Sequence, residues 1–265
     1  MLIQESNFKR KLRTLSLRIF DKLDNNNNPD FHKNGEEKFI NRLFPAIKAK
    51  CGDDKAVIFD IGANLGHYST MLVDYAKRNN LSTTIHAFEP TANTYQKAKE
   101  HTSKHPEVTI VNLAASNENG TARIFYDKEN SGLASLYERD LDSYNIKMSH
   151  SEEIKTIRLE DYISENNIQH IHFLKIDIEG HELKAFEGLG KYANADFIDF
   201  IQFEYGGANM DSGTTLRDFY YFFKNKGFRI CKIMKRGLLP ASYLPFRENF
   251  RYANYVAVSE KLKFQ

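Results

Sequence analysis

Short apolar runs, each typical of a buried strand, alternate along the chain with segments whose apolar residues have helical spacing. The predicted strands are residues 57–59, 84–88, 108–111, 172–176 and 197–203, and the predicted helices are residues 36–50, 68–78, 91–104 and 216–225. Such an alternation predicts an α/β fold with a mostly parallel sheet and helices on both faces. Two later strands, 228–234 and 252–258, are expected to form an antiparallel pair at the sheet edge. Pro45 is expected to kink or end the first helix.

A glycine-containing turn follows the first strand. Gly62 and Gly66 have no Cβ, so the backbone can turn tightly there and approach a ligand closely. The next strand ends at Glu89, roughly twenty residues further on, where nucleotide-binding α/β sheets place a carboxylate for the ribose hydroxyls. The sequence therefore predicts a nucleoside site at the carboxyl ends of the strands.

The residues of this turn indicate which nucleoside is bound. A dinucleotide site needs G-x-G-x-x-G, whereas here Asn64 replaces the middle glycine and an acid, Asp60, precedes the turn. A carboxylate there would repel a pyrophosphate but attract an ammonium or a sulfonium group. S-adenosylmethionine carries both of these cations, so the charge favours it over NAD. An NAD-binding oxidoreductase is the alternative enzyme, and a non-catalytic nucleoside-binding scaffold of the same fold is the second alternative.

Polar side chains end or follow the predicted parallel strands. They are Asp60, Glu89, Asn112, Asp177 and Glu204. Because neighbouring parallel strands lie about 4.8 Å apart, their carboxyl ends bring these side chains to one rim of the sheet. Four carboxylates on one rim are costly unless they bind a cation or accept hydrogen bonds. We therefore expect the rim to be the functional edge of the fold.

Several blocks of the sequence resemble the FkbM-type family of S-adenosylmethionine-dependent methyltransferases. The two most specific blocks are residues 59–66 with 88–90, and residues 174–182; weaker ones are residues 112–116, 158–162 and 254–258. His67 departs from the aromatic or small residue more usual in that family. The resemblance implies a class I methyltransferase fold and methylation of a hydroxyl on a sugar, a glycan or glycolipid precursor, or a natural product.

The resemblance also implies roles for individual residues. Asp60 and the turn from Gly62 to Gly66 would hold the methionine end of the cofactor, Glu89 would hold the ribose, and Asn112 and Ala115 would lie near the adenine. The residues expected to contact the cofactor are Asp60, Gly62, Ala63, Asn64, Gly66, Ser69, Glu89, Pro90, Asn112, Ala115 and Asp177. Residues 177–181 would face the acceptor.

Methyl transfer to an alcohol needs a base that accepts the hydroxyl proton. Asp177, Glu179 and His181 are the candidates, and the sequence does not rank them. His181 has the pKa best matched to neutral pH, while Asp177 has the more secure position at the end of a central strand. In an alternative arrangement, Asp177 and Glu204 hold Mg²⁺, which polarises the acceptor oxygen.

Two segments lie outside the strand–helix alternation. In residues 1–30, a basic segment with helical spacing is followed by an Asn-rich linker. Packing of this helix on the main domain or on a second subunit is the favoured interpretation, and contact with an anionic membrane surface is the alternative. Residues 31–265 would form the methyltransferase domain, in which residues 121–157 are an inserted cap, expected to be a hairpin and a mobile loop over the site.

Composition changes this picture little. The 37 basic and 35 acidic residues nearly balance, so we expect a small-molecule or glycan acceptor and no nucleic acid as partner. Cys51 and Cys231 cannot make a disulfide framework and have no metal-ligand spacing. No secretory signal and no membrane-spanning apolar run is recognised, so a cytoplasmic location is expected, with peripheral contact at the inner face of the membrane as an option. A homo-oligomer is compatible with the sequence.

Overall fold

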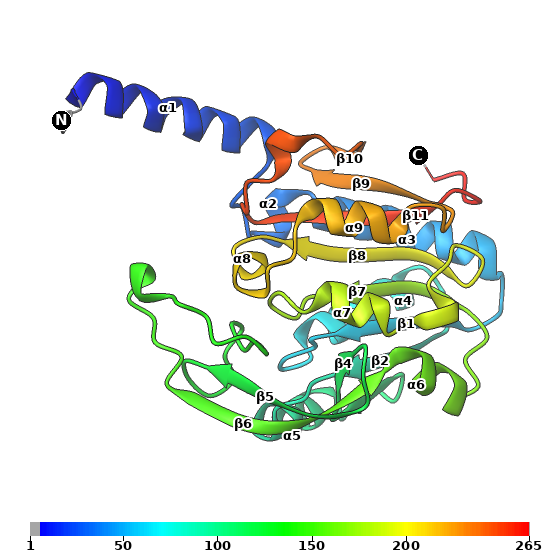
Figure 1. Ribbon diagram of the computed structural model, residues 1–265. Coiled ribbons are helices and arrows are strands. Elements are labelled where there is room, and N and C mark those ends of the chain that lie inside the picture. Colours follow the sequence, from blue (N-terminus) through cyan, green and yellow to red (C-terminus); the bar gives the residue numbers. More distant parts are fainter. Residues whose placement is uncertain (1–5, 265) are drawn as a thin grey trace.

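The computed structural model describes residues 6–264 and is organised around one eight-stranded sheet (Figure 1). Its strands are β1 (Ala56–Ile61), β2 (Thr83–Phe88), β3 (Val108–Val111), β7 (Ile171–Ile176), β8 (Ile198–Tyr205), β9 (Phe228–Met234), β10 (Gly237–Pro240) and β11 (Ala253–Ser259). The strand order is β10-β9-β11-β8-β7-β1-β2-β3. The five neighbouring strands β8, β7, β1, β2 and β3 are parallel to one another. This confirms the mostly parallel α/β sheet expected from the sequence.

The antiparallel strands are arranged differently from the expectation. β9 and β11 do pair antiparallel, but β11 lies inside the sheet between β8 and β9, and β10 forms the edge. Six of the seven residues of β11 are buried, as a central strand requires. The predicted edge position was therefore wrong for β11, whose apolar run 255–258 is better explained by burial on both faces.

Helices cover both faces of the sheet and give the molecule two apolar cores. On one face, α3 (Glu36–Cys51) and α4 (His67–Arg78) pack against the strands; on the other are α6 (Leu159–Glu165), α7 (Glu182–Glu187) and α9 (Leu216–Phe223). Figure 1 shows α7 and α9 in front of the sheet and α3 and α4 behind it. The remaining short helices are α2 (Phe31–Asn34), α5 (Ala92–Thr102) and α8 (Ala208–Ser212).

Pro45 does not end α3, which continues to Cys51. The apolar residues of the helix are buried on both sides of the proline: Phe39 and Leu43 precede it, and Ile47 follows it. Their packing against the sheet outweighs the one backbone hydrogen bond that proline removes.

Residues 114–158 form a second, smaller sheet. Its strands are β4 (Ala114–Ser116), β5 (Gly120–Tyr126) and β6 (His150–Arg158), in the order β4-β6-β5. β5 and β6 make an antiparallel hairpin, and the segment 127–149 that joins them extends to one side of the carboxyl ends of the main sheet (Figure 1). We call residues 127–149 the inserted segment.

The N-terminal helix α1 (Asn7–Asp24) projects away from the rest of the molecule (Figure 1). Among the described residues of α1 none is buried, so the stripe does not pack on the main domain, and packing on a second subunit stays a prediction. Its apolar residues have no facing groove on the domain to fill. The Asn-rich stretch after it is not a loose linker, because Asn25 and Asn26 are buried and Asn25 Nδ2 donates to the carbonyls of Asn34 and Ile233. Within residues 6–264, no helix combines the length and apolar character needed to cross a bilayer.

Candidate active site

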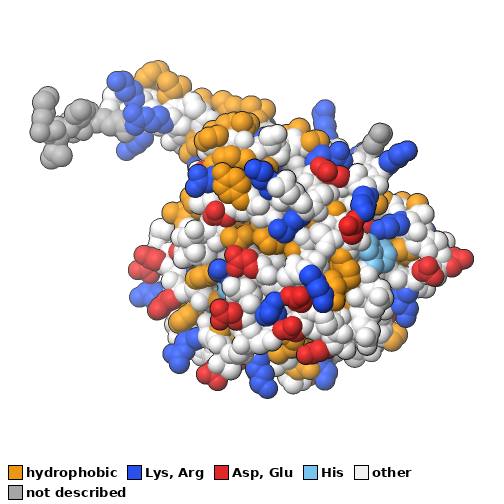
Figure 2. Space-filling view, turned by 45° about the vertical axis from the view of Figure 1, so that its right-hand side comes forward, with side chains coloured by type: hydrophobic (Ala, Val, Ile, Leu, Met, Phe, Trp, Pro, Cys, Tyr) orange, Lys and Arg blue, Asp and Glu red, His pale blue; other side chains and the backbone are white. Residues whose placement is uncertain are grey.

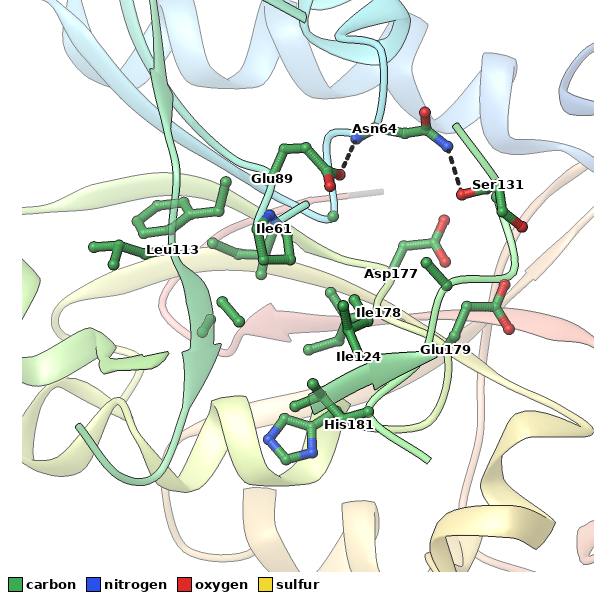
Figure 3. A pocket seen from close by; sticks show the side chains of 18 residues that line it. Ile61, Asn64, Glu89, Leu113, Ile124, Ser131, Asp177, Ile178, Glu179 and His181 are labelled. Atoms are coloured by element: carbon green, nitrogen blue, oxygen red, sulfur yellow. Dashed lines mark hydrogen bonds between the residues drawn. The ribbon is translucent and has the colours of Figure 1, made fainter. Parts of the chain in front are cut away.

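A cleft lies at the carboxyl ends of β1, β2 and β7, and residues of the inserted segment form part of its lining (Figure 3). Its empty volume is about 600 Å³, which includes space open to solvent. The sequence-predicted residues that line it are Gly62, Asn64, Glu89, Pro90, Ala115, Asp177, Glu179 and His181. The structure therefore brings both ends of the predicted site, the turn after β1 and the loop after β7, into one cavity.

The turn after β1 is fixed by hydrogen bonds to the end of β2. The backbone N–H groups of Gly62 and Ala63 both donate to the carbonyl of Phe88, at 3.0 and 2.9 Å. Gly62 has φ +87°, and a Cβ there would overlap the carbonyl oxygen of Asp177. Only glycine lets the turn pass this close to the end of β7. Asn64 has φ +49°, a conformation that asparagine tolerates better than most residues.

Glu89 is held rigidly at the end of β2. Its Oε1 accepts from the Thr91 N–H at 2.9 Å and from the Thr91 hydroxyl, and its Oε2 accepts from the Asn64 N–H at 3.1 Å. Burial raises the pKa of Glu89, while these hydrogen bonds act in the opposite direction. Because each carboxylate oxygen can accept about two hydrogen bonds, Oε2 keeps capacity for a ligand hydroxyl.

The side-chain oxygen of Asn64 is buried and has no hydrogen-bond partner within residues 6–264, and in Figure 3 it points away from Glu89. Another feature of the cleft suits a nucleoside. The wall next to Glu89 is apolar and consists of Phe88, Leu113, Ala114, Ala115, Ile124 and Leu136. An apolar wall beside hydrogen-bonding groups fits a flat base attached to a ribose.

The other end of the cleft is acidic. Asp177 follows β7 and forms an ion pair with Lys175. The distance from Lys175 Nζ to Asp177 Oδ2 is 3.0 Å. Glu179 has φ +52° and is paired with Arg139 at 2.5 Å. Burial, with the charge of Asp177 adding to it, raises the pKa of Glu179 to about 8. Glu182 begins α7, and its Oε1 accepts from the N–H groups of residues 178 and 180, so it supports this loop from behind.

His181 is held on both ring nitrogens. Nε2 lies 3.0 Å from the Ser116 hydroxyl, and Nδ1 lies 3.1 Å from the Tyr137 hydroxyl. Burial lowers the pKa of His181 to about 4, so the ring is neutral at neutral pH. Because both ring nitrogens already have hydroxyl partners, His181 is better suited to holding Ser116 and Tyr137 in place than to accepting a proton from an alcohol.

Successive residues of the inserted segment alternate between lining the cleft and binding the loop after β7. Ala134 and Leu136 line the cavity. Ser135, Tyr137 and Arg139, which alternate with them, bind the loop after β7: Ser135 Oγ donates to the Glu179 carbonyl at 2.7 Å, and the other two contact His181 and Glu179. Arg139 Nε also donates to Asp211 Oδ2 at 3.0 Å, which ties the segment to α8.

Other sequence-predicted residues do not line the cleft. Asp60 lies within β1, is fully buried, and accepts a hydrogen bond from Ser69 Oγ at 2.6 Å. Asn112 donates to the carbonyls of Glu89 and Pro90 and so stabilises the end of β2. Ala63 and Gly66 belong to the turn without lining the cavity.

Glu204 was expected to follow its strand but lies inside β8, which extends to Tyr205. Its pairing with β11, where Asn254 lies opposite Glu204, prolongs the strand. Burial raises the pKa of Glu204 well above its usual range, and the charges of Asp177 and Glu179 add to this effect. Glu204 therefore stands behind the acidic end of the cleft without lining it.

The described residues hold one group of three metal-ligating side chains, and it is not at this rim. The group comprises His170, His172 and Asp199. Lys50 already donates to Asp199 Oδ1 at 2.5 Å, so a cation of the protein itself satisfies the carboxylate. Asp177 and Glu204 belong to no such group among residues 6–264, and the structure adds no third ligand for the predicted Mg²⁺.

Sequence reasoning predicted an inserted cap over the site and Ala115 near the adenine, but it missed most of the apolar wall and the individual residues of the inserted segment. Phe88 and Leu113 have no chemistry of their own, so no motif marks them. Tyr137 and Arg139 lie in a polar stretch, and only the tertiary packing of the segment brings them to the loop after β7.

Comparison with known proteins is consistent with this arrangement. Residues 60–230 match the Methyltransferase FkbM domain. Methyltransferase 1 of Beauveria bassiana is 25% identical over 201 residues, covering 68% of this chain and 77% of that protein. The 31-O-demethyl-FK506 methyltransferase FkbM of Streptomyces tacrolimicus is 26% identical over 187 residues, covering 58% and 69%. The hexuronic acid methyltransferase AglP of Haloferax volcanii is 24% identical over 155 residues, covering 58% and 56%.

A solved FkbM methyltransferase from Methylobacillus flagellatus aligns with 76% of this chain and 43% of its own, with 15% identity and a TM-score of 0.46. The domain match covers more than half of the chain and includes the turn after β1, Glu89 and the loop after β7. This chain therefore belongs to the FkbM family of methyltransferases.

Proposed function

We propose that this chain is an S-adenosylmethionine-dependent O-methyltransferase whose acceptor is a hydroxyl on a sugar, a glycan or glycolipid precursor, or a natural product. The observation that carries the proposal is Glu89, which is buried, fixed by Asn64 and Thr91, and next to an apolar wall. The acceptor class is supported by the names of two relatives, a hexuronic acid methyltransferase and a methyltransferase of 31-O-demethyl-FK506.

In this proposal the cofactor lies along the cleft from the apolar wall to the acidic end. Glu89 Oε2, which the Asn64 N–H already holds in place, accepts from a ribose hydroxyl. The adenine lies against Leu113, Ala115 and Ile124. When bound, S-adenosylmethionine supplies an electrophilic methyl group. The acidic end near Asp177 then favours the positive charges of the methionine portion.

Asp177 is the base that we propose for the acceptor hydroxyl. Its side chain is 39% exposed toward the cleft, whereas that of Glu179 is 16% exposed and is held by Arg139. His181 is occupied on both nitrogens. Lys175 keeps Asp177 oriented, and the carboxylate can take the hydroxyl proton as the oxygen attacks in line.

Mg²⁺ held by Asp177 and Glu204 stays an alternative. Its support is weak, because Glu204 does not line the cleft. No observation favours NAD, since the Asn64 side chain occupies the place of the middle glycine of a dinucleotide site. The cytoplasmic location stays a prediction from the sequence.

Calorimetry tests the proposal directly. S-adenosylmethionine, S-adenosylhomocysteine and NAD are titrated into the full chain, each with Mg²⁺ and with EDTA. We expect binding of the first two in both conditions and none of NAD. Transfer of a labelled methyl group to a panel of free sugars, uronic acids and polyhydroxylated natural products then identifies the acceptor class. Binding of NAD alone, or transfer only to amines, would refute the assignment.

A further inference from the structure

Helix α1 presents an apolar surface that nothing in the described chain covers. Its apolar stripe consists of Phe8, Leu12, Leu15, Ile19 and Leu23, and each of these side chains is at least half exposed. The spacing of three and four residues places all five on one side of the helix. Figure 2 shows hydrophobic side chains along one edge of the projecting helix, with Lys and Arg side chains beside them.

The charges on α1 are strongly unbalanced. The helix carries two acidic residues, Asp21 and Asp24, and six basic ones, which are Lys9, Arg10, Lys11, Arg13, Arg18 and Lys22. Both acids are directed to the domain, where Asp21 pairs with Arg251 at 2.6 Å and Asp24 pairs with Lys232 at 2.5 Å. The charged residues on the projecting part of the helix are therefore all basic, and the apolar stripe runs along one side of it.

The same ion pairs fix the base of the helix. Phe20 adds an edge-to-face contact with Phe246, at 6.5 Å between ring centroids. The C-terminal residue Asn25 is buried and caps the helix in the left-handed conformation. The direction in which α1 leaves the domain is thus set by defined contacts of its last two turns.

Such a helix gains little from its own domain. Most of the stability of a protein helix comes from packing an apolar face, which α1 does not do within the described chain. Ser6 caps the amino end by accepting from the Lys9 N–H at 3.3 Å, a local contribution only. A surface that accepts the stripe would supply the missing stabilisation.

We propose that α1 docks this chain on an anionic lipid surface, with the stripe inserted at the boundary of headgroups and acyl chains and the flanking bases on the lipid phosphates. A basic helix with one apolar side is the form that lies in such an interface. Long Lys and Arg side chains beside the stripe, such as Lys11 and Arg18, can reach the headgroups while their stems stay apolar.

A second copy of the chain is a poorer occupant of the stripe. Two α1 helices packed stripe to stripe would bring their basic flanks together, which is unfavourable because like charges flank both seams. Asp21 and Asp24 cannot offset this repulsion, since both are engaged by the domain. Charge complementarity therefore selects an anionic surface. The proposal does not depend on the reaction that the domain catalyses.

Sedimentation with large unilamellar vesicles tests the docking. The full chain is mixed with vesicles of phosphatidylcholine alone, or of phosphatidylcholine and phosphatidylglycerol in equal amounts. Leu15→Glu places an acid on the stripe, and Leu17→Glu places the same acid about 200° around the helix, where Leu17 is 45% exposed. The two variants are matched in composition, and neither disturbs a buried contact.

We expect binding to the anionic vesicles only, and at least a tenfold weaker affinity for Leu15→Glu than for Leu17→Glu. The double variant Lys11→Gln/Arg18→Gln should bind about 30-fold more weakly than the unmodified chain, and about 1 M salt should weaken binding further. Absence of binding to anionic vesicles, or equal losses in the two glutamate variants, would overturn the proposal. A dimer in light scattering that Leu15→Glu alone dissociates would assign the stripe to a second copy instead.

Discussion

The backbone N–H of Asn64 donates to Oε2 of Glu89 across 3.1 Å, and this bond joins the glycine turn after β1 to the acid that ends β2. Two segments separated by 25 residues thus share one carboxylate. The position of Glu89 is set by the turn, and the turn is set in part by Glu89. A ligand that binds to this carboxylate meets a group that has already been oriented.

Glu89→Gln is expected to lower the affinity for S-adenosylmethionine about 10- to 100-fold, because a hydrogen bond to a charged acceptor is replaced by a hydrogen bond to a neutral one. Calorimetry measures the affinity. Glu118→Gln makes the same change at an exposed position and should leave affinity unchanged. Equal affinities of Glu89→Gln and the unmodified chain would remove Glu89 from the cofactor site.

Asp177→Asn should lower kcat by about 10²- to 10⁴-fold, the usual contribution of a general base, while cofactor affinity changes by less than the rate. Glu179→Gln is the comparison, since it also removes a carboxylate from the loop after β7. If Glu179→Gln lowers kcat and Asp177→Asn does not, the base is Glu179. Single-turnover methyl transfer separates the chemical step from product release.

Gly62→Ala should destabilise the fold by several kcal/mol, because the new Cβ would overlap the carbonyl oxygen of Asp177. Gly213→Ala provides the matched control: Gly213 also has a positive φ, +70°, but a Cβ there has nothing within 4 Å. This control should lose only about 1–2 kcal/mol from backbone strain. Urea denaturation measures both, and similar losses would show that the close approach at Gly62 carries no cost.

Arg139→Gln should lower the free energy of unfolding by about 3 kcal/mol, because it removes the ion pairs with the largely buried Glu179 and with Asp211 of α8. The double variant Arg139→Gln/Glu179→Gln should lose less than the sum of the two single variants. Arg123→Gln, at an exposed position of β5, is the control. Strict additivity in this cycle would mean that the pair contributes no coupling energy.

His172 should lower the stability of the fold as the pH falls from 6.5 to 4. Burial, with the charge of His170 adding to it, lowers the pKa of His172 to about 4, whereas an unfolded histidine titrates near 6.5. The unfolded chain therefore binds a proton first as the pH falls, and His172 contributes a loss of at most about 3 kcal/mol over this window.

His172→Asn isolates this contribution. Asparagine keeps an acceptor for the Val57 N–H, which donates to Nδ1 of His172 at 3.0 Å. All other titrating groups are shared by the two chains, so the unfolding free energy of the unmodified chain relative to that of the variant should decrease as the pH falls from 6.5 to 4. Identical pH profiles of the variant and the unmodified chain would contradict the lowered pKa of His172.

The sequence was sufficient for the central strands because each is a short apolar run with a polar residue at its end. Glu89 and Asp177 could be placed on the rim for this reason, and both line the cleft. Glu204 could not be placed in the same way, because β8 is prolonged by its pairing with β11, a neighbour that comes fifty residues later in the chain.

Other features depend on contacts that leave no local pattern. The stripe of α1 has the periodicity of a packed helix, and only the structure reveals that no groove faces it. Tyr137 and Arg139 could not be assigned to the site, since the path of the inserted segment is decided by its bonds to His181, Glu179 and Asp211.

The alternation within the inserted segment has a thermodynamic consequence. Ala134 and Leu136 touch the space proposed for the cofactor, and the residues between and after them, Ser135 and Tyr137, hold the loop that would face the acceptor. A ligand that fixes Ala134 and Leu136 also fixes Ser135 and Tyr137, because the four residues are consecutive in the backbone. The two substrates should therefore bind cooperatively, each increasing the affinity of the other by the same factor.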